Sequence, residues 1–335
     1  MKKKLFVLMV VAAMCLLSAC TGSAGASGPK SITPTPRGFG RITATISGLG
    51  SLPGEFDTYG IAADDTAVWV HNGDADDVLR IDPATNMVVA TITVGSGAGG
   101  VAIGDGSVWV ANGQGNTISR IDPATNKVVA TIRVGGEVTS VAISSGAVWA
   151  ADYGDSELVR IDPATNRVVA NVPNLIGVDD VSVGAGSTWV AARSDTTHGL
   201  TRVSTASNQV QTQIDTSNGN GLSCTAVVAL DQAIWTVDLA LGDGSSVVVE
   251  RIDPVTNKVV ATIPTPDAVP FQFAADDQGV WVYGPDTGLY RIDPQTNKVV
   301  GTLTMKGAAG VALGAGSVWL ANGQDGTLLR IAPTS

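Results

Sequence analysis

The chain is poor in charged and aromatic residues, and each shortage argues against a class of protein. Charged residues make up 15% and aromatic residues 5% of the 335 residues. A net charge of −10 offers no basic surface for phosphates, so we expect no nucleic-acid partner. The 40 glycines, with few helix-forming residues, argue against a helical bundle. The 44% apolar residues can nevertheless bury a large core, which excludes a disordered chain.

Cysteine is also scarce, and two of the three cysteines lie near the N-terminus. A basic start at Lys2 to Lys4 precedes the apolar run from Leu5 to Leu17. This run is shorter than the roughly 20 residues that span a bilayer. The pattern predicts a signal peptide over residues 1–19.

The end of that segment, Leu17-Ser18-Ala19-Cys20, resembles the lipobox of bacterial lipoproteins. The resemblance implies that Cys20 becomes a lipidated N-terminus and that the protein is extracytoplasmic, anchored to a bacterial membrane of the cell envelope. The alternative is an ordinary secretory signal cleaved after Ala19. Residues 20–40 are rich in Gly, Ser, Thr and Pro and read as a flexible tether. Only Cys224 would remain as a thiol, so no intrachain disulfide is expected.

Residues 41–335 consist of seven copies of one unit. Arg-Ile-Asp-Pro recurs five times, with degenerate copies at 202–205 and 330–333. Each copy carries one tryptophan, at positions 69, 109, 149, 189, 235, 281 and 319. A period near 40 residues is typical of the four-stranded blades of a β-propeller.

One copy shows the expected strands. Residues 100–104 are small and apolar, as an innermost strand requires, and Asp105-Gly106 is a hairpin signal. Residues 107–111, 117–121 and 127–132 supply three more strands, and Asp-Pro-x-Thr-Asn forms the last turn. No stretch shows sustained helical periodicity.

The fourth strands indicate a closed ring. Seven third strands occur, but only six are followed by a fourth strand, and residues 41–47 resemble the missing one. We therefore expect an all-β, seven-bladed propeller of four-stranded antiparallel blades, closed when strand 41–47 joins the last blade.

The Val-Trp-Val-Ala-Asn and Arg-Ile-Asp-Pro-x-Thr-Asn segments resemble the YVTN/YncE-type β-propeller repeat of exported bacterial proteins. The pattern is also similar to the virginiamycin B (streptogramin) lyase family. That resemblance implies a seven-bladed propeller with a metal-dependent site of His and Glu in the last blades. Residues 265–333 contain neither His nor Glu, so no catalytic residue can be carried over.

The repeated residues are interpreted as structural. One tryptophan per unit predicts packing between blades, and the seven arginines before Ile-Asp-Pro predict pairing with acidic or carbonyl groups of a neighbouring blade. Cys224 is interpreted as a buried small residue.

Function is expected where the copies differ, on the face formed by the loops around the channel mouth. Those loops carry aromatic, acidic and basic residues that differ between the copies. The candidate ligand-binding residues are Tyr59, His71, Glu137, Asp152, Tyr153, Asp180, Arg193, His198, Phe271, Phe273 and Tyr283. The alternative is neutral variation of surface loops.

Metal binding is the weaker alternative for this face. A site joining His71 and His198 with Glu137 or Asp180 would be chemically sound. Calcium could use residues 74–77 or 238–243, but neither completes a calcium-loop pattern. We therefore predict no cofactor and no catalytic residue, with Mg²⁺ or Ca²⁺ as the alternative.

The function predicted from these features is a non-catalytic binding platform on a monomeric propeller, held to a membrane by its N-terminal lipid. Its partner would be a protein, peptide, glycan or small molecule bound through one face of the ring. The alternative is a metal-dependent, streptogramin lyase-like carbon–oxygen lyase with its site at the channel mouth.

Overall fold

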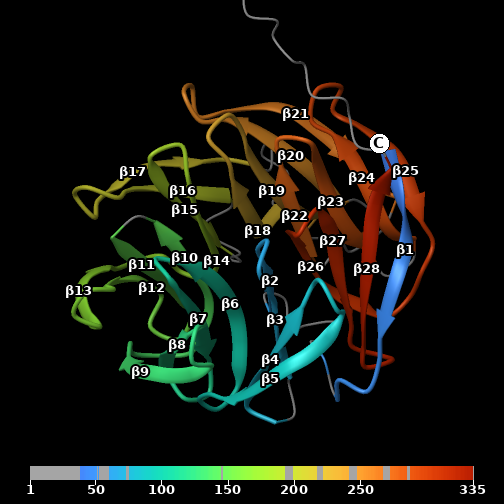
Figure 1. The fold of residues 1–335 in the computed structure, drawn as a ribbon. Coiled ribbons are helices and arrows are strands. Elements are labelled where there is room, and N and C mark those ends of the chain that lie inside the picture. Colours follow the sequence, from blue (N-terminus) through green and yellow to red (C-terminus); the bar gives the residue numbers. More distant parts are fainter. Residues whose placement is uncertain are drawn as a thin grey trace, which may run out of the picture. The chain divides into compact units, whose positions relative to one another are not determined.

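The computed structural model describes residues 38–50, 52, 60–72, 75–144, 146–192, 199–216, 222–240, 247–266, 272–284 and 287–334. They belong to one compact unit, residues 35–335. Across these ranges the chain forms 28 strands and no helix. The strands build seven antiparallel sheets of four strands each, arranged in a ring (Figure 1). The predicted all-β, seven-bladed propeller is confirmed.

Each blade uses four strands that are consecutive along the chain, except the last. Blades 1 and 2 contain β2 (Ile61–Ala63), β3 (Val68–Asn72), β4 (Asp77–Asp82), β5 (Met87–Thr93), β6 (Ala98–Gly104), β7 (Ser107–Asn112), β8 (Thr117–Asp122) and β9 (Lys127–Arg133). Blades 3 and 4 contain β10 (Val138–Ser144), β11 (Ala147–Asp152), β12 (Glu157–Asp162), β13 (Arg167–Val172), β14 (Val178–Gly184), β15 (Ser187–Ala192), β16 (Gly199–Ser204) and β17 (Val210–Ile214). Blades 5 and 6 contain β18 (Leu222–Ala229), β19 (Ile234–Ala240), β20 (Val247–Asp253), β21 (Lys258–Pro264), β22 (Gln272–Asp276), β23 (Gly279–Gly284), β24 (Gly288–Asp293) and β25 (Lys298–Leu303). Blade 7 contains β26 (Ala308–Gly314), β27 (Ser317–Asn322), β28 (Thr327–Thr334) and β1 (Gly38–Ile46).

The turns have the backbone conformations that their residue types predict. Asp105 and Gly106 both have positive φ, 47° and 68°, as the two-residue hairpin between β6 and β7 requires. In the Asp-Pro turns, the asparagine at the fifth position is left-handed, for example Asn126 at φ 56°. Asp122 holds this turn by accepting hydrogen bonds from the Ala124 N–H at 2.9 Å and the Thr125 hydroxyl at 2.8 Å.

The N-terminal strand lies at the outer edge of blade 7. β1 pairs antiparallel with β28, and the register places Ile42 opposite Ile331 and Ile46 opposite Leu328. The strand predicted at 41–47 corresponds to this element. Because the chain supplies the first and last residues of one sheet, that blade has no turn between its third and fourth strands.

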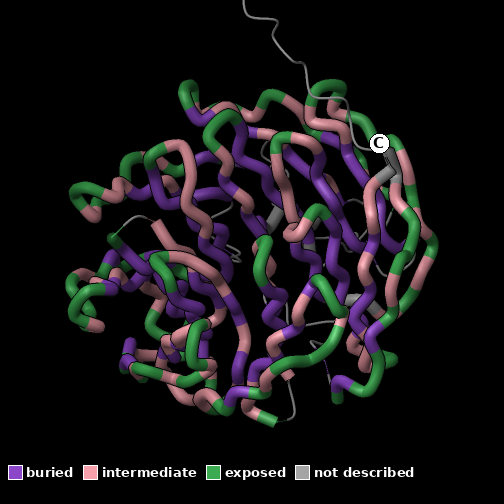
Figure 2. Tube along the Cα trace, viewed as in Figure 1, coloured by how far each residue is buried: buried purple, intermediate pink, exposed green. Residues whose placement is uncertain are grey.

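Tryptophan packing between blades is confirmed. All seven tryptophans are buried, and each packs against the next blade around the ring. Trp109 of blade 2, for example, packs with Val141, Val148 and Ile161 of blade 3. Burial follows the same pattern throughout, with buried residues inside the sheets and exposed ones at turns and outer strands (Figure 2).

An arginine on the third strand of each blade stacks on the tryptophan of the same blade. The distances from the guanidinium carbon to the ring centroid run from 4.9 Å at Arg202 to 5.8 Å at Arg291. Most of these arginines also reach the next blade: Arg120 Nη1 donates to the Pro163 carbonyl at 2.6 Å and to Asn166 Oδ1 at 2.9 Å. The predicted pairing with carbonyl groups of a neighbouring blade is therefore confirmed, and it joins consecutive blades through their Asp-Pro turns.

Arg291 faces blade 7, where the Asp-Pro turn is replaced by the two ends of the chain. Its Nη2 donates to the Gln278 carbonyl of its own blade at 2.5 Å.

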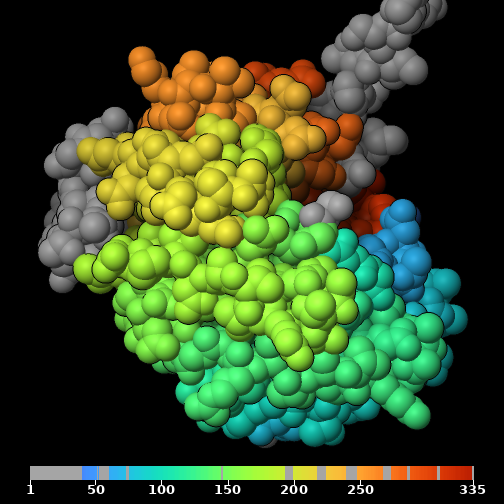
Figure 3. Space-filling view, turned by 90° about the vertical axis from the view of Figure 1, so that its left-hand side faces the viewer, coloured from blue at the N-terminus to red at the C-terminus, as the bar shows by residue number. Residues whose placement is uncertain are grey.

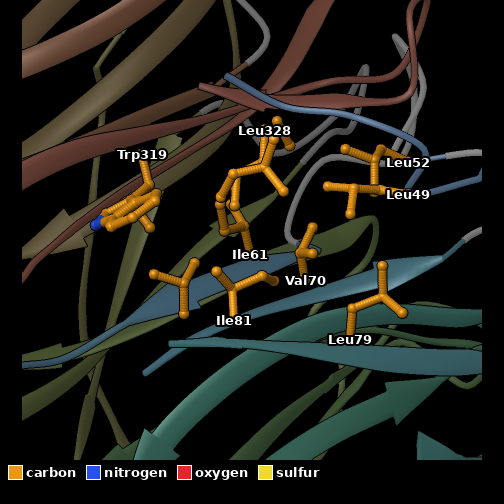
Figure 4. Close-up of a cluster of buried hydrophobic side chains, with 12 residues drawn as sticks. Leu49, Leu52, Ile61, Val70, Leu79, Ile81, Trp319 and Leu328 are labelled. Atoms are coloured by element: carbon orange, nitrogen blue, oxygen red, sulfur yellow. The ribbon is translucent and has the colours of Figure 1, made fainter. Parts of the chain in front are cut away.

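Blades 7 and 1 are joined by the same two kinds of contact as other neighbouring blades, arginine hydrogen bonds and tryptophan packing. Arg330 Nη1 donates to the Pro83 carbonyl at 2.5 Å and to Asn86 Oδ1 at 3.2 Å. An apolar cluster between them combines Trp319 and Leu328 with Ile61 and Val70 (Figure 4). The side view shows successive blades packed against one another as bands from green through yellow to orange (Figure 3).

None of the residues described above forms a helix long and apolar enough to cross a bilayer.

Candidate ligand-binding cavity at the ring axis

The first strands of all seven blades surround a cavity of about 140 Å³. Its described lining residues come from β2, β6, β10, β14, β18, β22 and β26: Ile61, Val101, Ser140, Val141, Asp180, Ala226, Val227, Val228, Phe273 and Val311. The lining side chains are apolar except for one hydroxyl and one carboxyl, and polar atoms also face the cavity. A concave apolar site with a few converging polar groups is the usual form of a small-molecule site.

Small residues allow the inner strands to approach closely around this cavity. A Cβ added to Gly310 would lie 2.8 Å from Ile61 Cγ2, and one added to Gly100 would lie 2.9 Å from Ser140 Cα. Both neighbours belong to the adjacent blade. The glycines therefore set the diameter of the inner ring.

Asp180 is the charged group of the cavity and is almost completely buried, with 5% of its surface exposed. Its Oδ1 accepts hydrogen bonds from the Ser140 hydroxyl at 2.7 Å and from the Val181 N–H at 2.7 Å. Its Oδ2 accepts one from the Val227 N–H at 2.9 Å. The carboxyl thus ties β14 to β10 and β18, across three blades.

Burial dominates the acidity of this group. Desolvation raises the pKa of Asp180 to about 7, although its three hydrogen bonds oppose the shift; the neighbouring Asp179 raises it further. Near neutral pH, Asp180 therefore exchanges between its neutral and its charged form.

The sector behind Asp180, between blades 4 and 5, is unusually acidic. Burial raises the pKa of Asp238 to about 6 and that of Glu250 to about 8. Burial, followed by the charges of Asp238, Asp180 and Glu250, raises the pKa of the Cys224 thiol well above its ordinary value. Cys224 is buried, as predicted, and is surrounded by groups that disfavour a thiolate.

Buried polar side chains form hydrogen bonds in this interface. Asp238 accepts hydrogen bonds from the hydroxyls of Thr216 at 2.6 Å and Thr236 at 2.7 Å. Glu250 Oε1 accepts one from the Thr262 hydroxyl at 3.0 Å, while its buried Oε2 has no hydrogen-bond partner. At the strand position of Glu250, blade 3 has the buried Val159.

The candidate residues predicted from the sequence do not form one surface. Five are buried: His71, Asp152, Asp180, Phe273 and Tyr283. Glu137 and Tyr153 are exposed. Tyr59, Arg193, His198, Phe271 and Cys20 lie outside the described residues. Of the candidates that the structure describes, the cavity brings together Asp180 and Phe273.

Three of the buried candidates have packing or bracing contacts. Asp152 accepts hydrogen bonds from the Gly136 N–H at 2.9 Å and the Asp155 N–H at 3.0 Å, so it holds two loops together. The His71 Nδ1 lies 3.1 Å from the Gly99 carbonyl of the next blade. Tyr283, at the matching position of blade 6, belongs to the apolar cluster with Trp281 and Val311. All three side chains are buried: His71 and Tyr283 share a strand position that faces the next blade, whereas Asp152 lies beneath the loops that it joins.

The sequence does not single out three of the residues described above as ligand-binding candidates: Ser140, Asp238 and Glu250. Asp238 enters only through the calcium alternative at residues 238–243. Glu250 was detectable, since it is the one charged residue immediately before the repeated arginine among the seven copies. Within the described ranges, no group of three or more His, Cys, Asp or Glu side chains could hold a metal ion.

Fold and cavity together define a seven-bladed β-propeller with a central, mostly apolar site. Residues 93–233 match the model of a repeat family of unknown function, DUF6923. No curated protein sequence matches the chain.

Solved structures share its architecture at low sequence identity. Hydrazine synthase of Kuenenia stuttgartiensis aligns with a TM-score of 0.72 and 16% identity, over 87% of this chain and 97% of that one. Virginiamycin B lyase from Staphylococcus aureus aligns with a TM-score of 0.71 and 16% identity, over 86% and 98%. A streptogramin B lyase aligns at 0.69 and 16%, over 87% and 98%. The propeller is therefore similar in fold to these lyases.

Proposed function

We propose that this protein is a lipid-anchored, extracytoplasmic propeller that binds a small ligand without transforming it, in the cavity at the ring axis. The observation that carries the proposal is the lining of that cavity, where apolar side chains from six blades surround one buried carboxyl from blade 4. Such a site can hold and orient a ligand. The rest of the ring serves as a rigid frame for it.

Membrane attachment is part of the same proposal and rests on the Leu17-Ser18-Ala19-Cys20 segment. Mass spectrometry of the N-terminal peptide from the bacterial envelope tests it. We expect a diacylglyceryl group on Cys20 and its loss in Cys20→Ser. An unmodified N-terminus beginning at Cys20 would instead support the ordinary secretory signal.

The binding role is tested by what the native protein carries. We expect protein purified from its own envelope to yield, on denaturing extraction, a small molecule that is absent from an Ala226→Leu variant. Leucine at this position would fill the cavity without changing the surface. A folded wild-type protein that repeatedly carries nothing, in extracts where known lipoproteins retain their ligands, would contradict the proposal.

The rival function is a lyase-like reaction, suggested by the structural similarity to virginiamycin B lyase. Incubation with a streptogramin B depsipeptide, with Mg²⁺ and with EDTA, separates the two. Under our proposal the depsipeptide stays intact in both conditions. Mg²⁺-dependent ring opening would establish the rival function.

A further inference from the structure

The cavity has the charge and size of a site for one class of ligand. We infer, building on the proposed function, that it binds a small organic cation: a protonated amine with an apolar body, its ammonium group against Asp180.

The charge argument begins with the surroundings of Asp180. None of the described residues that line the cavity is Lys, Arg or His. The nearest charged neighbour on the same strand is another acid, Asp179. A buried carboxylate without a cationic partner is unfavourable, and a cation entering the cavity would supply that partner.

The hydrogen bonds around Asp180 favour its charged form. All three contacts, from Ser140, Val181 and Val227, donate to the carboxyl. A carboxylate can accept about four hydrogen bonds, and Oδ2 accepts only one here, so it retains capacity for a donor. An ammonium group donates and accepts nothing, which matches this arrangement.

The size argument comes from the walls. Valines and isoleucine supply an apolar surface, with Phe273 as the aromatic member. The volume of about 140 Å³ compares with the roughly 150 Å³ apolar cavity that accommodates benzene. The ligand body should therefore be about the size of one five- or six-membered ring. An aromatic face near a cation adds to the attraction.

The inference has a pH signature that a purely apolar cavity would lack. Strand β10 contributes no titratable group, β18 contributes only the buried thiol of Cys224, and β14 contributes Asp179 beside Asp180. Because the pKa of Asp180 is raised to about 7, affinity for an ammonium ion should rise about tenfold from pH 6 to pH 8 and then level off. A neutral ligand should show no such rise.

The test compares cyclopentylamine, which is charged throughout this pH range, with the isosteric cyclopentanol, by isothermal titration of the folded wild-type protein. We expect the amine to bind at least roughly tenfold more tightly at pH 8. We expect that advantage to shrink about tenfold at pH 6. Asp180→Asn should abolish both effects, whereas Asp152→Asn, a buried carboxyl that does not line the cavity, should change neither.

Wild-type titrations alone decide the matter if Asp180→Asn does not fold. Equal affinity for amine and alcohol at pH 8, both blocked by Ala226→Leu, would overturn the ligand class and leave the proposed binding function standing. No binding of either compound would also overturn the inference. The proposed function would then be tested separately, by extracting the small molecule that the native protein carries.

Discussion

We predict that Glu250 contributes a loss of stability as pH rises, opposite in direction to the contribution of a carboxyl whose pKa is lowered by folding. The side chain has no exposed surface, and burial, with the nearby charge of Asp238, raises its pKa from 4.5 to about 8. In the unfolded chain it would ionise near 4.5. As pH rises from 4.5 to 8, the unfolded state releases a proton that the folded state retains, so stability falls across that window.

The magnitude follows from the two pKa values. At 1.36 kcal/mol for each pKa difference of one, the full cost at pH 7.5 is about 4 kcal/mol, against about 1 kcal/mol at pH 5. Solvent screening reduces such costs, and we expect about 2 kcal/mol at pH 7.5. Glu250→Gln removes the titration with little change of shape. It should therefore be more stable than wild type by about 2 kcal/mol at pH 7.5, with a much smaller difference at pH 5.

Urea unfolding at both pH values measures the effect, with Glu137→Gln as the exposed control. The control should follow wild type at both pH values. If Glu250→Gln and wild type lose stability equally between pH 5 and pH 7.5, Glu250 does not hold a proton in the folded protein and the reasoning fails.

Three further predictions concern the ring. Deleting residues 40–48 removes most of the strand that pairs with β28; we expect a loss of about 3 kcal/mol or more and a melting point lower by several degrees, and unchanged melting would refute the pairing. Trp109→Ala empties a fully buried site between blades and should cost about 3–5 kcal/mol in denaturant unfolding. Arg120→Met and Arg330→Met each remove one arginine hydrogen bond between neighbouring blades, and each should lower the free energy of unfolding by about 1–3 kcal/mol. A much smaller loss for Arg330→Met would indicate that blades 7 and 1 are not joined like the other blades.

The sequence predicts the ring because repetition reveals which features are structural. The tryptophan and the arginine represented by Trp109 and Arg120 recur once in every copy, and the structure places them in equivalent contacts in successive blades. The strand at the N-terminus was also readable, because one fourth strand was missing from an otherwise regular count. Local turn chemistry at Asp105-Gly106 and at Asn126 needed no tertiary information.

The candidate site was harder to predict, because exposure of a strand residue depends on which blade it faces. Tyr283 differs from its counterparts in other copies, which suggested an open loop position, yet it packs against blade 7. Asp180 was identified by its departure from the repeat, but its partners Ser140 and Val227 are 40 and 47 residues away and belong to other blades. These separations are about one repeat, so the periodicity places the three residues in neighbouring blades, but it does not show that their polar groups meet.

Most of the buried acidic residues lie together in the sector of blades 4 and 5. Asp180 ties blade 4 to its two neighbours, and Glu250, Asp238 and Thr216 lie in the interface just behind it. Among the described residues, four of the five buried acids, Asp179, Asp180, Asp238 and Glu250, belong to blades 4 and 5, and the fifth is Asp152 of blade 3. Departures from a local rule that lower stability are expected where a protein has a function to perform. The same buried acids place negative charge beside the cavity, and this is the property that a cationic ligand would use.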